Sequence, residues 1–219
     1  KAKPSLDSEE EEPYFPYSEP RDYQKKAFEL WKDNKQKGLF AMATGTGKTI
    51  TALNCLLEIF KRNGYYKAII LVPTVTLLKQ WEKQCAKLKF HHILKISSKN
   101  KDWKSGLLKL QIAERLSGDP KEQNYIIITT YASFIHDDVF NVLNSLPRKR
   151  VLLIADEAHN MGASQISKRL PYVNIIRRIG LSATPERQFD DKGNKLISQF
   201  FNLEGNNYTF EYRMDDAIR

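Results

Sequence analysis

The sequence predicts an α/β protein with a mostly parallel central sheet that is flanked by helices on both faces. Short β-branched runs, such as residues 68–72 (AIILV) and 126–130 (IIITT), alternate with stretches whose apolar residues recur every three to four positions. Strands that alternate with helices in this way are typical of parallel sheets, which helices cover on both sides. The 219 residues are enough for one large domain of this class.

Three segments are expected along the chain. Residues 1–20 begin with acidic residues and continue as a proline-rich stretch, which predicts an extended or disordered lead-in. Residues 21–203 form the predicted domain, and the polar, turn-rich residues 204–219 are expected to be a linker or the start of a second domain. Within the domain, four helices are expected: one that begins at residue 23, one from the glycine-rich loop to about residue 62, one over about 76–88 and one within 97–123. Strands are expected at 39–43, 68–72, 126–130, 151–156 and 175–184.

The charge of the chain favours a polyanionic partner, nucleic acid first. Lys and Arg total 35 against 26 acids, a formal net charge of +9, and residues 1–12 carry two lysines against five acids, so the rest holds about +12. Residues 83–109 contain eight lysines, one acid and Trp103, which indicates either contact with nucleic acid or a solvated face with Trp103 packed inward. A basic surface without a specific partner remains the alternative.

Nothing in the sequence indicates a membrane or a secretory route. No apolar run approaches the roughly 20 residues that a membrane helix needs, and the N-terminus has no apolar signal segment. Cys55 and Cys85 stand in apolar surroundings and are most simply reduced core thiols. We therefore expect a cytoplasmic protein with no membrane partner.

Residues 43–49 (ATGTGKT) follow an apolar strand and precede a predicted helix. Gly45 and Gly47 permit a tight backbone path, so that N–H groups can surround phosphate oxygens. Lys48 supplies positive charge for the β- and γ-phosphates, and Thr49 offers a hydroxyl ligand to Mg²⁺. The general pattern has a glycine five residues before Gly47, where this sequence has Met42. The loop predicts phosphate binding; a chance turn at a helix start is the alternative.

A second candidate element is the acidic end of the strand in LLIADEAHN, residues 152–160. Asp156 and Glu157 would lie at the carboxyl edge of the sheet, where open α/β folds bind ligands. Asp156 is expected to hold Mg²⁺ through its water shell, and Glu157 to activate a water for attack on the γ-phosphorus. Two acids at such a place also occur simply because a helix N-terminus favours them.

Together, ATGTGKT, DEAH (156–159) and GLSATP (180–185) resemble motifs I, II and III of superfamily 2 DEAD/DEAH-box helicases. The resemblance covers about residues 21–187 and implies the N-terminal RecA-like domain, a P-loop NTPase fold. MATGTGKT and SATPER are closer in form to restriction-enzyme (type I and III R subunit) and repair-type DNA helicases than to RNA helicases. The resemblance therefore implies ATP and Mg²⁺ as cofactors, DNA rather than RNA, a second RecA-like domain beyond Arg219, and a possible nuclease or methyltransferase partner.

The same resemblance implies roles for further residues. The segment RDYQ (21–24) matches the family's adenine-reading segment, although an ordinary helix start would look the same locally. His159 is expected in the relay that couples the nucleotide to nucleic acid, since the remaining His and Cys residues are too sparse for a zinc site. The implied contacts are Arg21, Gln24, Thr44, Gly45, Thr46, Gly47, Lys48 and Thr49 for nucleotide; Pro73, Thr74, Thr130 and Tyr131 for the nucleic-acid backbone; and Ser182 and Thr184 with His159 for coupling.

The expected function is that of an ATP-dependent helicase or translocase motor domain, with Lys48, Asp156 and Glu157 as its catalytic residues. The rivals are a nucleotide-regulated binding or scaffold module without productive turnover, and an ATPase that acts on protein or small molecules. In the resembled family an arginine from the second domain stabilises the transferred phosphoryl group. Only 34 residues follow GLSATP, so we expect this chain alone to bind ATP but to hydrolyse it weakly.

Overall fold

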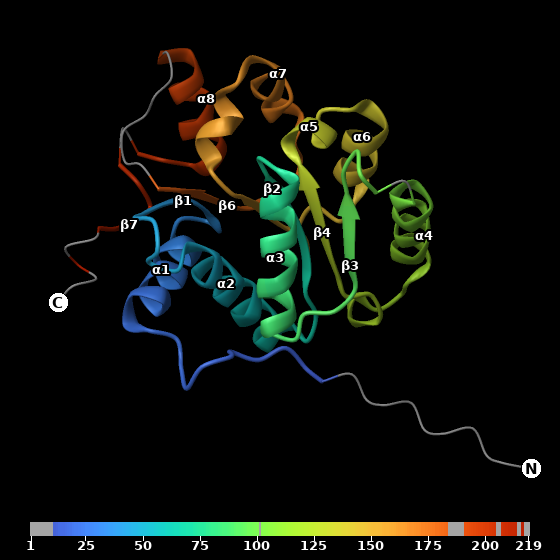
Figure 1. The fold of residues 1–219 in the computed structure, drawn as a ribbon, viewed down its shortest axis with the longest axis horizontal. Helices are drawn as coiled ribbons and strands as arrows, with labels where there is room; N and C mark the ends of the chain where they lie inside the picture. Colours follow the sequence, from blue (N-terminus) through green and yellow to red (C-terminus); the bar gives the residue numbers. More distant parts are fainter. Residues whose placement is uncertain (1–10, 101, 184–190, 205–206, 214–215, 217–219) are drawn as a thin grey trace, which may run out of the picture.

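The computed structural model describes residues 11–100, 102–183, 191–204, 207–213 and 216. Within these residues, seven strands form one sheet in the order β3-β4-β2-β5-β6-β1-β7, and every neighbouring pair is parallel. The prediction of a mostly parallel α/β sheet is therefore confirmed (Figure 1). The strands are β1 Lys37–Met42, β2 Lys67–Val72, β3 Ile93–Ile96, β4 Tyr125–Thr130, β5 Leu152–Ala155, β6 Arg177–Ser182 and β7 Phe210–Tyr212.

Helices cover both faces of this sheet, because its central strands are apolar on both sides. Along β2, Ile70 and Val72 belong to one core cluster, whereas Ile69 and Leu71 belong to the other. The helices α1, α2 and α3 pack on the first cluster, and α4 to α8 on the second (Figure 1). The α-helices are α1 Asp22–Asp33, α2 Lys48–Asn63, α3 Val75–Lys87, α4 Trp103–Leu116, α5 Tyr131–Phe134, α6 Asp137–Ser145, α7 Ser164–Ser167 and α8 Asp191–Phe201; short 3₁₀ turns span Pro120–Glu122, Ala158–Gly162 and Leu170–Tyr172.

Two edge strands differ from what the sequence suggests. β3 lies in the basic segment at one edge of the sheet, where no strand was predicted. Its four residues are only partly buried, and they lack the longer apolar run that marks a central strand. β7 lies within residues 204–219, which were expected to be a linker or the start of another domain, yet it pairs with β1. The division of the chain into domains stays a proposal, but Phe210–Tyr212 belong to this sheet.

The described part of the lead-in lies against the domain. The backbone N–H of Tyr14 donates to the carbonyl of Leu88 over 3.0 Å, and Phe15 packs on the core beneath α1 to α3. Cys55 and Cys85 are free and buried, and burial raises the pKa of the Cys85 thiol to about 12. Among the described residues, no helix is both long and apolar enough to span a membrane.

Candidate nucleotide-binding site

The residues predicted to carry chemistry leave their strands at one edge of the sheet. The loop 43–49 follows β1, and Asp156 and Glu157 follow β5. The carboxyl ends of parallel strands meet at this edge, which brings together residues that are distant in sequence. The other strand ends there carry Pro73 and Thr74 after β2, Thr130 and Tyr131 at the end of β4, and Ser182 in the last position of β6.

The loop after β1 has the backbone path of a phosphate-binding loop. Gly45 and Gly47 adopt φ values of +83° and +87°, which residues with a Cβ rarely adopt. Gly47 stands directly before α2, so the helix N-terminus with its free N–H groups begins at Lys48. Within the loop, the Thr46 hydroxyl donates to the carbonyl of Ala43 over 2.6 Å. These features suit a loop that is shaped to surround an anion.

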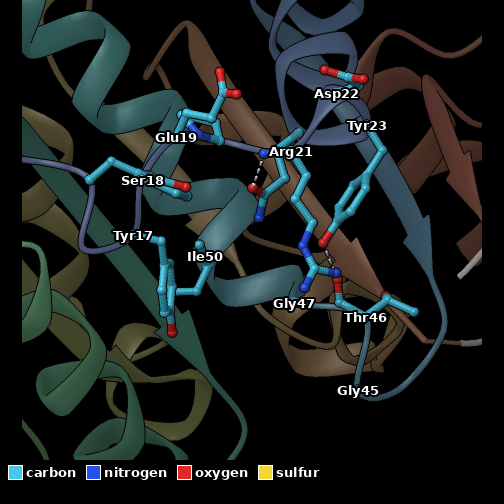
Figure 2. Close-up of a pocket in the computed structure, with 13 residues that line it drawn as sticks. Tyr17, Ser18, Glu19, Arg21, Asp22, Tyr23, Gly45, Thr46, Gly47 and Ile50 are labelled. Carbon is cyan, nitrogen blue, oxygen red and sulfur yellow. Dashed lines mark hydrogen bonds between the residues drawn. The ribbon is translucent and has the colours of Figure 1, made fainter.

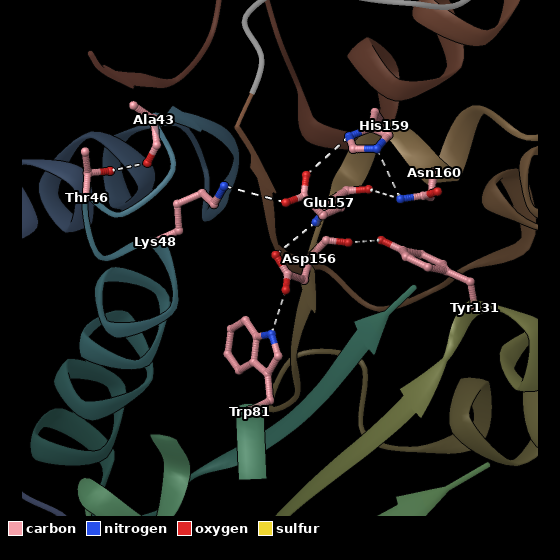
Figure 3. A network of polar contacts seen from close by, with 9 residues as sticks. All are labelled: Ala43, Thr46, Lys48, Trp81, Tyr131, Asp156, Glu157, His159 and Asn160. Atoms are coloured by element: carbon pink, nitrogen blue, oxygen red, sulfur yellow. Dashed lines mark hydrogen bonds and ion pairs between the residues drawn. The ribbon is translucent and has the colours of Figure 1, made fainter. Parts of the chain in front are cut away.

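Lys48 and Glu157 face each other across the site, with 3.6 Å between Nζ and Oε1 (Figure 3). The second carboxylate oxygen of Glu157 lies 3.4 Å from Nδ1 of His159. The amide of Asn160 contacts the ring of His159 and donates to the Glu157 carbonyl over 2.9 Å. Glu157 itself has φ +47° and ψ 56°, an uncommon conformation for a residue with a side chain and one often found at functional sites.

Asp156 lies deeper than Glu157 and is almost fully buried. Its carboxylate accepts a hydrogen bond from the indole N–H of Trp81 over 2.8 Å and another from the N–H of Glu157 over 3.0 Å (Figure 3). Burial raises the pKa of Asp156, and the Trp81 hydrogen bond acts in the opposite direction. The protein therefore holds a desolvated carboxylate in one fixed orientation.

Tyr131 and Thr130 were expected to face nucleic acid, and the structure gives each an internal partner. The Tyr131 ring is buried, and its hydroxyl donates to the carbonyl of Asp156 over 2.8 Å. Burial raises the pKa of that phenol well above its usual value. Thr130 is also buried and caps the short helix α5 through the N–H of Ser133. Tyr131 thus supports the acidic strand end, and Thr130 holds the start of α5.

The other predicted contacts vary in exposure. Thr74 is exposed and caps α3, accepting from the N–H of Leu77 over 3.2 Å, with Pro73 half-buried before it. Ser182 is buried at the end of β6. Thr184 lies outside the described residues.

A pocket of about 620 Å³ opens beside the phosphate loop (Figure 2). The buried Gln24 accepts from the backbone N–H of Arg21 over 2.9 Å through its side-chain oxygen. A Cβ on Gly47 would lie 3.9 Å from the Gln24 amide nitrogen, so this amide stands next to the loop. The pocket lining combines the lead-in, the start of α1 and the loop: Phe15, Tyr17, Ser18, Glu19, Pro20, Arg21, Asp22, Tyr23, Gln24, Gly45, Thr46, Gly47 and Ile50.

Sequence reasoning missed three residues of this site. Trp81 orients Asp156, Tyr23 donates its hydroxyl to the carbonyl of Thr46 over 2.8 Å, and Tyr17 lines the pocket. One available signal was that a buried tryptophan or tyrosine usually finds a partner for its polar atom. No pattern in the sequence says which atom that partner is.

The donors at the loop and at β5 fit Mg²⁺ bound together with phosphates. Mg²⁺ typically takes one or two carboxylates or hydroxyls and completes its shell with phosphate oxygens and water. Asp156 and Thr49 provide such a set, with Asp156 already oriented by Trp81. Among the described residues there is no group of three His, Cys, Asp or Glu side chains that could hold a metal by itself, as a zinc site would require.

Comparison with known proteins gives the following matches. The family model described as type III restriction enzyme, res subunit, matches residues 17–187. The DNA 3'-5' translocase XPB2 of Sulfurisphaera tokodaii is 30% identical over 176 residues, which are 80% of this chain and 33% of that protein. The putative DNA 3'-5' helicase Rad25 of Haloarcula marismortui is 29% identical over 172 residues, 78% of this chain and 24% of that protein.

Solved structures share the fold. The Sulfolobus solfataricus SWI2/SNF2 ATPase core in complex with dsDNA has a TM-score of 0.62 at 22% identity, over 89% of this chain and 38% of that one. The ATP-dependent type ISP restriction-modification enzyme LlaBIII bound to DNA has a TM-score of 0.59 at 23% identity, over 77% of this chain and 13% of that one. The chain spans about a quarter to a third of the length of the curated relatives it matches.

Proposed function

This chain belongs to the family of type III restriction enzyme res subunits, which confirms the helicase resemblance of its motifs, and we propose that it is the ATP-hydrolysing domain of a DNA motor. The observation that carries the proposal is the convergence of a phosphate loop, a buried aspartate and a glutamate at one sheet edge. Lys48 and Glu157 come within 3.6 Å although they follow different strands. A chance turn or a simple helix N-terminus would not bring these groups together.

ATP is expected to bind with its base in the pocket beside Gln24 and its phosphates on the loop. The free edge of the Gln24 amide faces the base, and the ring of Tyr17 offers an apolar surface for it. The N–H groups at the start of α2 and the Lys48 ammonium receive the phosphates. Thr49 and Asp156 would hold Mg²⁺, which neutralises charge on the β- and γ-phosphate oxygens.

Glu157 is the proposed general base. Its carboxylate is partly exposed and faces Lys48 of the loop. In that position it accepts a proton from the water that attacks the γ-phosphorus. His159 and Asn160 hold the carboxylate and backbone of this residue, so they are proposed as positioning residues that link the acidic turn to the nucleic-acid surface.

DNA is expected to contact the exposed N-terminus of α3 and the exposed side of the same helix. Lys79, Lys83 and Lys87 lie four residues apart on the exposed side of α3. Other lysines of the basic segment already pair with acids: Lys89 with Glu11, Lys95 with Glu82 and Lys104 with Asp138. The α3 lysines therefore carry more of the proposed backbone contact than the loop around Trp103.

Phosphate release tests this function against a module that binds ATP without turnover. We expect release to be slow for this chain alone and to rise when DNA is added, and to rise much further in a longer natural protein that contains a second RecA-like domain. RNA of the same length should stimulate less. Absence of phosphate release from both proteins, despite tight ATP binding, would favour the scaffold module without turnover. Release that no nucleic acid changes would favour an ATPase that acts on protein or small molecules.

A further inference from the structure

The last described strand reaches back to the phosphate loop. β7 runs beside β1, with Tyr212 opposite Met42, the last residue of β1. The next backbone contact lies in the loop itself, because the N–H of Ala43 donates to the carbonyl of Tyr212 over 3.1 Å. A strand from the far end of the chain therefore holds the first residue of the loop.

The side chain of Tyr212 makes a second contact with the loop through Tyr23. The two rings stack, with centroids 4.2 Å apart and planes at 19°. The hydroxyl of Tyr23 donates to the carbonyl of Thr46 over 2.8 Å, and the Thr46 hydroxyl closes the turn onto Ala43. Tyr212 thus fixes the start of the turn directly and its other end through Tyr23.

Such contacts matter for this loop because its glycines leave it many conformations. Gly45 and Gly47 have positive φ values, and glycine loses more freedom on ordering than any other residue. A loop that is held in its binding shape beforehand loses less freedom when a ligand arrives, so its affinity is higher. Neither tyrosine belongs to the loop, yet together they bracket it.

We propose that Tyr212 is a positioning residue for the phosphate loop, acting through Tyr23, and that docking of β7 is linked to nucleotide binding. The inference rests on the proposed function, since it takes the ligand of the loop to be a nucleotide. Linkage is reciprocal: whatever affinity β7 docking adds for nucleotide, nucleotide adds to β7 docking. β7 has three residues and lies at the sheet edge beside β1. A short edge strand opens locally more easily than a central strand, so its docking can respond to a bound ligand.

The test combines amide hydrogen exchange with titration of a fluorescent ATP analogue. In Tyr212→Ala without nucleotide, we expect faster exchange in residues 43–47 and an affinity about three- to tenfold lower, the range of one aromatic pair. Tyr212→Phe keeps the ring, so its loop exchange and nucleotide affinity should match those of the wild-type protein. Glu211→Ala is the matched control on the same strand, because that side chain is exposed and pairs with Arg213, two residues along the chain.

Three further results decide the route and the linkage. Tyr23→Phe should lower affinity, and adding it to Tyr212→Ala should cost little more, because both changes break one chain of contacts. Nucleotide should slow exchange at 207–213 in the wild-type protein and much less in Tyr212→Ala. Should Tyr212→Ala not fold, Tyr212→Leu keeps an apolar side chain and removes the stack.

Unchanged loop exchange and affinity in the folded variant would overturn the proposal, as would full additivity of the two substitutions. Exchange at 207–213 that does not respond to nucleotide would overturn the linkage. If the wild-type protein binds no nucleotide, the proposed function fails, and exchange of the nucleotide-free loop alone then decides whether Tyr212 positions it.

Discussion

Replacing Trp81 by phenylalanine tests how Asp156 is held at the end of β5. The substitution removes the indole N–H that donates to the Asp156 carboxylate over 2.8 Å, within a side chain that is 1% exposed. A hydrogen bond to a charged group contributes about 1.5–3 kcal/mol. The smaller ring loses about 1–2 kcal/mol more in packing. The free energy of unfolding should therefore fall by about 2.5–5 kcal/mol near neutral pH.

The dependence on pH separates these two contributions. Burial raises the pKa of Asp156 above its ordinary 3.8, and the Trp81 hydrogen bond partly offsets this. Loss of the donor should raise the pKa further, because the ionised form loses a partner that the protonated form needs less. The charge-dependent part of the loss is thus fully present above the variant's pKa. It disappears as the pH falls through that value to the wild-type pKa, and only the packing loss remains.

Trp31→Phe provides a matched control. Trp31 is also 1% exposed and packs in the same core cluster, but its N–H donates to the neutral carbonyl of Arg178 over 2.9 Å. Urea unfolding of both variants and the wild-type protein, followed by circular dichroism from neutral pH down to the onset of acid unfolding, gives the comparison. The Trp31→Phe loss should stay constant. Parallel pH profiles for the two variants would refute the assignment of Trp81 as the group that stabilises ionised Asp156.

Three further predictions concern the charged and thiol groups. Glu157→Gln should abolish phosphate release, because the amide cannot accept the proton of the attacking water. It should bind a fluorescent ATP analogue as tightly as the wild-type protein or up to about fivefold tighter, because Lys48 loses an ion-pair partner that competes with phosphate. Wild-type turnover would remove Glu157 from the mechanism. Lys83→Glu should weaken DNA binding at low salt and reduce the slope of log affinity against log salt by about 1–2. Lys104→Glu should change this slope less, because Lys104 pairs with Asp138. Equal slopes in all proteins would place the DNA contact elsewhere. Cys55 and Cys85 should react with a thiol reagent only at the rate of unfolding, since burial raises the pKa of both thiols, and rapid labelling of the native protein would contradict their burial.

The sequence predicts the sheet and the nucleotide loop because both depend on local patterns. The β-branched runs of β2 and β4 are buried on both faces, and the glycines at 45 and 47 occupy positions that need positive φ. The motifs also assigned Lys48 and Glu157 to one nucleotide site, and the structure brings their charged atoms within 3.6 Å.

What the sequence could not predict depends on contacts between distant segments. β7 is short and ordinary in composition, and it becomes a strand because β1 offers a free edge. Tyr131 follows a strand and looks locally like a routine strand exit, yet it is buried and its hydroxyl donates to the carbonyl of Asp156. The Tyr23 and Tyr212 stack joins the first helix to the last strand, so no local pattern marks it.

The most direct test of the central claim, that the loop after β1 binds nucleotide phosphates, is equilibrium titration of ATP, ADP and AMP onto wild-type protein and Lys48→Ala. The matched control is Lys61→Ala, an exposed lysine on the same helix that pairs with Glu58. We expect the wild-type protein to bind in a Mg²⁺-dependent way, most tightly to ATP, then ADP, then AMP. In Lys48→Ala the affinity for ATP should fall at least about tenfold, with an unchanged unfolding midpoint. Equal affinities for ATP and AMP, or unchanged ATP binding by a folded Lys48→Ala protein, would contradict the claim.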